Sequence, residues 1–85
     1  MRAVFSPGNG EVEVYELLIP ESWAGRKLGE LLCTVESCLP VALTRTGRSS
    51  LPTQDTVVET GDVVAISATA DGIACLRNAL AGKEV

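Results

Sequence analysis

Residues 39–68 constrain the fold of this chain more than any other segment, because strand and turn signals alternate along them. Leu39, Val41 and Leu43 occupy every second position, which is the pattern of a strand with one face in the core. Thr46-Gly47 follows, and glycine tolerates the positive φ that a tight reversal needs. The sequence therefore predicts a β-hairpin whose first arm has Leu39, Val41 and Leu43 buried.

The second half of this segment predicts one further strand. Residues 48–51 form the short return arm, and Pro52 ends it because proline has no N–H for a ladder hydrogen bond. Gly61-Asp62 is a second turn signal. The apolar, β-branched run 63–66 comes directly after it and is typical of a central strand covered on both faces.

The N-terminal part predicts another strand over residues 12–19, with two competing phases. Val12 and Val14 share one face, while the other face carries Tyr15, Leu17 and Ile19. We expect the Tyr15 phase to face the core, with either a bulge or cover on both faces resolving the conflict. Residues 1–5 are either a short strand or the remnant of a connection, and residues 6–10 are turn formers typical of a linker.

A first helix is predicted over residues 24–32, with Ser22 as its cap and a stripe of Leu28, Leu31 and Leu32. Gly25 and Gly29 weaken this helix and permit close backbone approach. One interpretation is that this helix face meets another subunit or the sheet at short distance. The other is that the segment is a loosely specified surface helix. Trp23 either plugs the core or belongs to a subunit contact.

A last helix is predicted to begin after Thr69, with Thr69 or Asp71 as the cap. Its inner stripe is Ile73, Leu76 and Leu80, and residues 81–83 form a stop signal. The predicted class is α+β: a small mixed sheet with two helices in the order β-α-β-β-β-α. Residues 1–10 are an N-terminal segment or linker remnant, and residues 11–85 form one domain.

Six ordered motifs resemble the C-terminal domain of the TrkA family, also called the RCK C-terminal domain, of prokaryotic potassium-transport regulators. Residues 25–31 are similar to the family's G-(K/R)-x-L-x-x-L helix. The motifs are VYELLIPES (14–22), AGRKLGEL (24–31), VALTRTG (41–47), LP (51–52), DTV (55–57) and ETGDVV (59–64). The resemblance covers residues 11–80 and implies the same α+β fold.

Composition excludes several classes of function. Net charge of −4 argues against nucleic-acid binding, which needs clustered Lys and Arg. No apolar run approaches the length of a membrane helix, and no leader stands at the N-terminus, so we expect a soluble, unexported chain without direct membrane insertion.

Chemistry of a catalytic or metal-binding kind is not expected either. The chain has three cysteines, Cys33, Cys38 and Cys75, and an odd number indicates reduced cytosolic thiols. We expect Cys75 to be a small core residue of the last helix. The chain has no His to activate a thiol or complete a zinc site, and neither a phosphate-binding glycine motif nor a carboxylate pair is evident. We therefore predict no enzyme, no metal site and no cofactor within this chain.

The resemblance implies a cytoplasmic regulatory domain that senses a ligand and forms a homodimer in a potassium uptake system of the Trk/Ktr type. Its partners would be a nucleotide-binding domain or subunit and a membrane potassium transporter, through which it would lie peripherally at the inner face of the membrane. Arg45 matches a family position near the phosphate of a cyclic dinucleotide at the dimer seam, and Arg48 lies across the turn. Guanidinium groups suit phosphate, so Arg45 and Arg48 are the predicted ligand-binding residues, with a cyclic dinucleotide or a cation as the ligand.

Two alternatives stay open for these residues and for the domain. Arg45 and Arg48 could form only a solvated hairpin tip. The domain could be a purely structural dimerisation module, or the cytosolic regulatory domain of another cation transporter or antiporter. A symmetric interface would use an exposed strand edge together with the face that carries Gly25 and Gly29.

Overall fold

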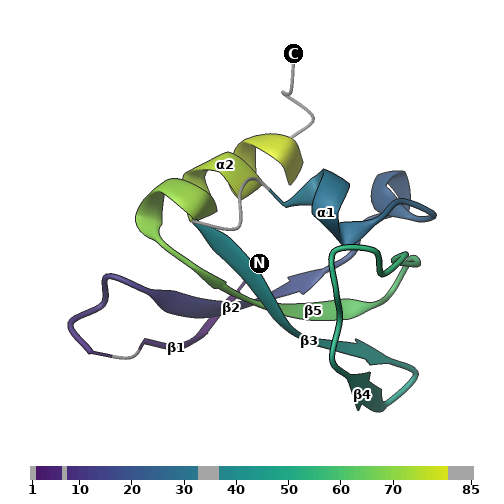
Figure 1. Ribbon diagram of the computed structural model, residues 1–85, viewed down its shortest axis with the longest axis horizontal. Coiled ribbons are helices and arrows are strands. Elements are labelled where there is room, and N and C mark those ends of the chain that lie inside the picture. Colours follow the sequence, from purple (N-terminus) through teal and green to yellow (C-terminus); the bar gives the residue numbers. More distant parts are fainter. Residues whose placement is uncertain (1, 7, 33–36, 81–85) are drawn as a thin grey trace.

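Five strands form one sheet, and the helices lie on one side of it (Figure 1). The computed structural model describes residues 2–6, 8–32 and 37–80. The strands are β1 Arg2–Phe5, β2 Glu13–Leu18, β3 Cys38–Arg45, β4 Arg48–Ser50 and β5 Val63–Ala68. The helices are the 3₁₀ turn η1 Glu21–Trp23, α1 Leu28–Leu31 and α2 Ala70–Leu80. The predicted helix stop at 81–83 lies outside the described residues.

The strand order in the sheet is β1-β2-β5-β3-β4, and every pair in it is antiparallel. The predicted α+β class is confirmed, but the sheet is antiparallel and not mixed. The reason is that β2 and β3 run in the same direction yet never pair, because β5 lies between them. Residues 2–5 form the edge strand β1, which was one of the two alternatives for the N-terminus.

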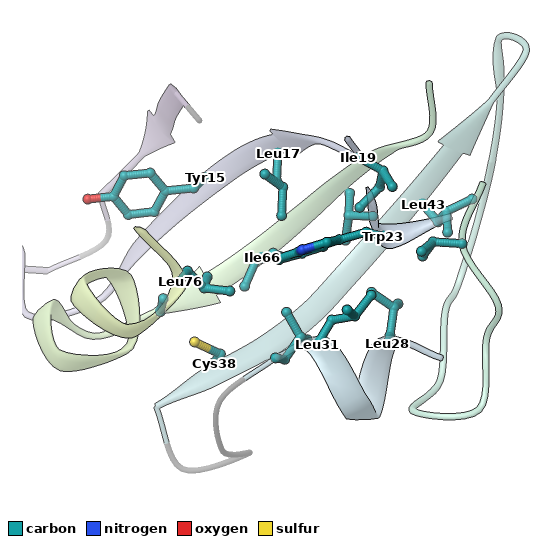
Figure 2. Packing of buried hydrophobic residues seen from close by; sticks show 14 of the residues in the cluster. Tyr15, Leu17, Ile19, Trp23, Leu28, Leu31, Cys38, Leu43, Ile66 and Leu76 are labelled. Atoms are coloured by element: carbon teal, nitrogen blue, oxygen red, sulfur yellow. The ribbon is translucent and has the colours of Figure 1, made fainter. Parts of the chain in front are cut away.

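The core lies between the sheet and the helices (Figure 2). Tyr15, Leu17 and Ile19 are buried, so the chosen phase of β2 is confirmed. Trp23 is also buried in this cluster, which confirms its role as a plug over the core. Burial of such apolar surface is the main favourable term for a chain this small.

A β-bulge in β3 overturns the predicted burial of its first arm. The pairing with β5 shifts between Pro40 and Ala42, so Val41 is an extra residue on β3. Leu43 is buried as predicted, whereas Leu39 and Val41 are exposed. A bulge changes the alternation of side chains along its strand, and this is why a period-two pattern misplaced both residues.

β5 occupies the centre of the sheet, as predicted, but it is fully covered on only one face. Val64, Ile66 and Ala68 are buried against the helices, while Val63 and Ala65 stay half-buried on the other side. The prediction of cover on both faces is therefore wrong for the described residues.

The first helix is much shorter than the predicted span 24–32. Only α1 is α-helical, and Gly25 has φ of +87°, which a right-handed helix excludes. Ser22 lies within η1, and the cap position of α1 is Lys27, which makes no side-chain cap bond. The apolar stripe of Leu28, Leu31 and Leu32 is buried as predicted.

Pairing with a distant segment shortens this helix. The amide of Gly25 donates to the carbonyl of Val58 (2.8 Å), and the amide of Gly29 donates to the carbonyl of Gln54 (2.8 Å). A Cβ on Gly29 would lie 3.0 Å from that same carbonyl oxygen. The close approach at Gly29 is therefore made by the connection between β4 and β5 of the same chain, and the predicted subunit contact there is not needed to explain the glycine.

The hairpin and the last helix follow the prediction. Thr46 and Gly47 both have positive φ, 49° and 81°, and β4 ends before Pro52. Thr69 Oγ1 accepts from the amide of Gly72 at 3.3 Å, so Thr69 is the cap. Ile73 and Leu76 are buried on the inner side of α2.

Candidate functional site

The predicted residue Arg45 ends β3 and turns toward the helix side of the sheet, where it meets Asp62. Its Nε donates to Asp62 Oδ1 at 2.9 Å, and its Nη2 donates to Asp62 Oδ2 at 2.6 Å. The same Nη2 donates to the carbonyl of Val57 at 3.1 Å. This is a two-pronged arginine–carboxylate pair, the geometry that makes such pairs strong and directional.

The carboxylate of Asp62 is held by the turn before β5. Glu59 N donates to Asp62 Oδ2 at 2.9 Å, and Asp62 N donates back to the carbonyl of Glu59 at 3.1 Å. Gly61 supplies the positive φ of +90° that this turn requires. Asp62 is the one buried polar residue among those described, and its carbonyl accepts from Ile19 N at 2.8 Å. It thereby joins the end of β2, the turn and the end of β3.

Hydrogen bonds from Arg45 lower the pKa of Asp62 below its ordinary value, and the amide of Glu59 acts in the same direction while burial opposes it. The same pair raises the pKa of Arg45. Asp62 is thus a carboxylate at neutral pH, and its charge is matched there by the guanidinium of Arg45.

Arg48 is the direct cross-strand partner of Arg45, so the structure brings the two predicted ligand-binding residues together. Arg48 is exposed, whereas the side chain of Arg45 is 39% exposed. Arg45 Nη1 forms an ion pair with Glu59 Oε2 at 3.6 Å, which is longer than a hydrogen bond. Among the described residues, Nη1 is therefore the nitrogen of Arg45 whose N–H groups are still without a hydrogen-bond acceptor. A role for either arginine in ligand binding stays a prediction.

Two small cavities lie away from these arginines. One of about 130 Å³ is lined by Val12, Ser37, Cys38, Leu39, Ser67, Ala68 and Thr69. A second of about 130 Å³ is lined by Trp23, Arg26, Glu30, Leu31 and Ala79. Pockets for small organic ligands usually measure about 300–1,000 Å³, so both cavities are smaller than such pockets.

Cys75 departs from its predicted place in the core. Cys38 is buried in the core, whereas Cys75 lies on the exposed side of α2 and is disulfide-bonded. The expectation of reduced thiols and of a core position is therefore wrong for Cys75. Cys33 lies outside the described residues.

Residues that could hold a metal ion do not gather in groups of three or more within residues 2–6, 8–32 and 37–80. Over the same residues, no helix has the length and apolar character needed to cross a membrane.

A known family matches the part of the chain that runs from β2 through α2. The TrkA-C domain matches residues 14–81 of the 85-residue chain. This chain belongs to the TrkA-C domain family. Membership indicates a regulatory domain of a potassium or other cation transport system. A search of curated proteins gave no match.

The pairing of Arg45 with Asp62 was missed in the sequence, although both residues were singled out there. A signal for it exists, because an arginine in a half-buried strand and an acid at a buried turn each need a partner. Within this TrkA-C domain the partner of Arg45 is 17 residues away in the chain, and local patterns do not report such a distance.

Proposed function

We propose that this TrkA-C domain is the cytoplasmic, non-catalytic regulatory part of a potassium uptake system of the Trk/Ktr type, and that it dimerises and senses a small anionic ligand. Family membership over residues 14–81 carries the proposal. The domain would act together with a nucleotide-binding domain or subunit and a membrane potassium transporter. A ligand that favours one arrangement of two copies needs a coupling of only about 1–3 kcal/mol to give useful control.

The arginine pair supports the choice of an anionic ligand. Arg48 is exposed, and it lies opposite Arg45 in the register of β3 and β4. Arg45 Nη1 is ion-paired with Glu59 Oε2 at 3.6 Å, so the exposed guanidinium of Arg48 is the main group available to a phosphate. Phosphate groups of a cyclic dinucleotide match donors of this kind, because a guanidinium offers parallel N–H bonds to two oxygens.

One observation favours a second candidate, a purely structural dimerisation module. Nε and Nη2 of Arg45 are already bonded to Asp62 and to the carbonyl of Val57. An arginine that holds its own fold together has fewer donors for a ligand, and a ligand that competed for them would weaken the turn before β5.

A thermal-shift screen on the full chain separates the two candidates. The probes are cyclic dinucleotides, ATP, NAD and divalent cations, each added in excess. A ligand at one hundred times its Kd stabilises the native state by about 2.7 kcal/mol, which raises Tm measurably. A shift with a cyclic dinucleotide supports ligand sensing, and no shift with any probe refutes ligand sensing and leaves the structural module.

Matched variants locate the site. We expect Arg48→Gln to keep the Tm of the ligand-free protein, because this side chain is exposed, and to lose the ligand-induced shift. Lys27→Gln removes an equal charge from an exposed side chain whose nearest acid, Asp55, is 4.0 Å away. It should keep the shift. Equal shifts in both variants would remove Arg48 from the site.

A further inference from the structure

Asn9 is followed by Gly10 in the connection between β1 and β2, and this pair has a chemical reactivity that the proposed function does not use. Both residues are exposed, and Figure 1 shows the connection as a loop that projects from the sheet. A Cβ built on Gly10 would meet no described atom within 4 Å. Because glycine also has no side chain of its own, the peptide nitrogen of Gly10 is open to close approach by a neighbouring group.

The side chain of Asn9 is held against the peptide that follows it. Asn9 Oδ1 accepts a hydrogen bond from the amide of Glu11 at 3.2 Å. The ring that this bond closes contains the peptide nitrogen of Gly10, so the side-chain amide of Asn9 is kept beside that nitrogen. A donor at Oδ1 also stabilises the negative charge that develops on this oxygen when a nucleophile adds to Cγ.

These contacts favour the ring closure that makes asparagine thermolabile. The Gly10 nitrogen, after losing its proton to water, forms a bond with Cγ of Asn9. The bond from Cγ to the side-chain nitrogen breaks, and that nitrogen takes up a proton and leaves as ammonia. Water then adds to one carbonyl carbon of the five-membered imide, whose bond to the Gly10 nitrogen breaks, and the nitrogen regains a proton. Opening at Cγ gives aspartate, and opening at the main-chain carbonyl gives isoaspartate.

Asp71-Gly72 offers the same order of side chain and glycine, but the fold closes it to this reaction. The pair lies in the first turn of α2, where the amide of Gly72 donates to Thr69 Oγ1 at 3.3 Å. Gly72 is buried, and a Cβ there would lie 2.2 Å from the carbonyl oxygen of Ser37. The Gly72 nitrogen is therefore engaged and crowded, so it can attack only after α2 opens locally.

Asn78 is the other asparagine of the chain, and it is exposed like Asn9. It lies in α2 and is followed by Ala79, which carries a Cβ. In a helix, each amide donates to the carbonyl four residues before it, so a reaction at Asn78 also needs local opening. The two asparagines are thus matched in exposure and differ in their backbone.

We propose that Asn9-Gly10 is a site of spontaneous covalent modification, at which Asn9 converts to aspartate and isoaspartate while Asn78 and Asp71 stay intact in the folded protein. Either product adds one negative charge to the formal net charge of −4. Isoaspartate also adds one carbon atom to the main chain. No residue of β1 is buried, and β1 lies at the edge of the sheet beside β2, so the lengthened connection leaves the core intact. The product therefore accumulates in folded protein.

Incubation of the full chain at neutral pH and physiological temperature, followed by peptide mapping with mass spectrometry, tests the proposal. Conversion at Asn9 should be roughly tenfold faster than at Asn78 or more, because Asn78 reacts only from a locally opened helix. An isoaspartyl carboxyl methyltransferase with a labelled methyl donor should label the same peptide, since isoaspartate leaves a free main-chain carboxylate. Asn9→Gln is the matched variant: its side chain would have to close a six-membered ring, so the acidic form seen on ion exchange should be lost.

Urea separates the effect of the fold from that of the local sequence. In urea, isoaspartate should also form at Asp71, because unfolding releases the amide of Gly72. Equal conversion at Asn9 and Asn78 in the native protein would overturn the proposal, and so would an acidic form that persists in Asn9→Gln. Isoaspartate at Asp71 that forms as fast in the native protein as in urea would refute the protection by α2.

Discussion

Replacing Asp62 by Asn should destabilise the fold far more than any exposed acid does. The carboxylate accepts two hydrogen bonds from Arg45 and one from the amide of Glu59. An Asn amide group would turn N–H donors toward at least one of these donors. Hydrogen bonds to charged groups contribute about 1.5–3 kcal/mol each. Because the side chain of Arg45 is 39% exposed and water can replace part of the loss, we expect about 2–4 kcal/mol in total.

This loss is large for a chain of this length. At about 0.05–0.15 kcal/mol per residue, an 85-residue domain has a free energy of unfolding of about 4–13 kcal/mol. The substitution should therefore lower Tm by roughly 10–30 °C. Urea unfolding followed by the fluorescence of Trp23, which is buried and the only tryptophan, gives the free energy directly. All proteins are compared at one concentration, because association also stabilises the native state.

The pH dependence has a definite sign. The pKa of Asp62 is lower in the folded state than in the unfolded state, so its contribution is present above the unfolded value of about 3.9 and is lost as the pH falls through the folded pKa. The difference between the native protein and Asp62→Asn should stay constant from neutral pH to about 5 and shrink in stronger acid.

A matched control and a double-mutant cycle make this reasoning refutable. Asp55→Asn is the same substitution at a side chain that is 89% exposed, and it should change stability by less than about 0.5 kcal/mol. Arg45→Met alone and together with Asp62→Asn gives the coupling between the two side chains. An Asp62→Asn variant as stable as the control, or a difference between native and variant protein that does not shrink in acid, would refute the stabilising role of the Arg45–Asp62 pair.

Three further outcomes follow from close contacts elsewhere. Gly72→Ala should destabilise the domain by more than about 2 kcal/mol in urea unfolding, because the new Cβ would lie 2.2 Å from the carbonyl oxygen of Ser37; a variant as stable as the native protein would contradict that packing. Gly29→Ala should cost less, since its Cβ would lie 3.0 Å from the nearest backbone oxygen, and the order of the two variants is the check. Tyr15 donates to Glu13, which raises the pKa of Tyr15, so an ultraviolet absorbance titration should show ionisation at higher pH than in Glu13→Gln.

Most of the elements could be predicted because their signals are local. The period of the apolar residues in β2, the turn with positive φ at Gly47, and the cap at Thr69 each depend on neighbours within a few positions. Arg45 and Arg48 were also placed together by a local argument, since two residues that flank a two-residue turn face each other across the hairpin.

The errors share one cause, which is contact between distant parts of the chain. The first helix was predicted too long because its glycine spacing does not reveal that Gln54 and Val58 compete for its backbone amides. Leu39 and Val41 were predicted to be buried because a bulge is set by the pairing of β3 with β5 and not by the composition of β3 alone.

The amino-acid sequence by itself determined the kind and order of the elements and the family, because periodicity, turn residues and ordered motifs are all written along the chain. Only the tertiary structure decided which apolar residues stay on the surface, how short α1 is, and that Arg45 is bound to Asp62. The physical reason is that hydrogen-bonding groups and apolar surfaces take whichever partner the fold brings within reach, and that partner is commonly many residues away.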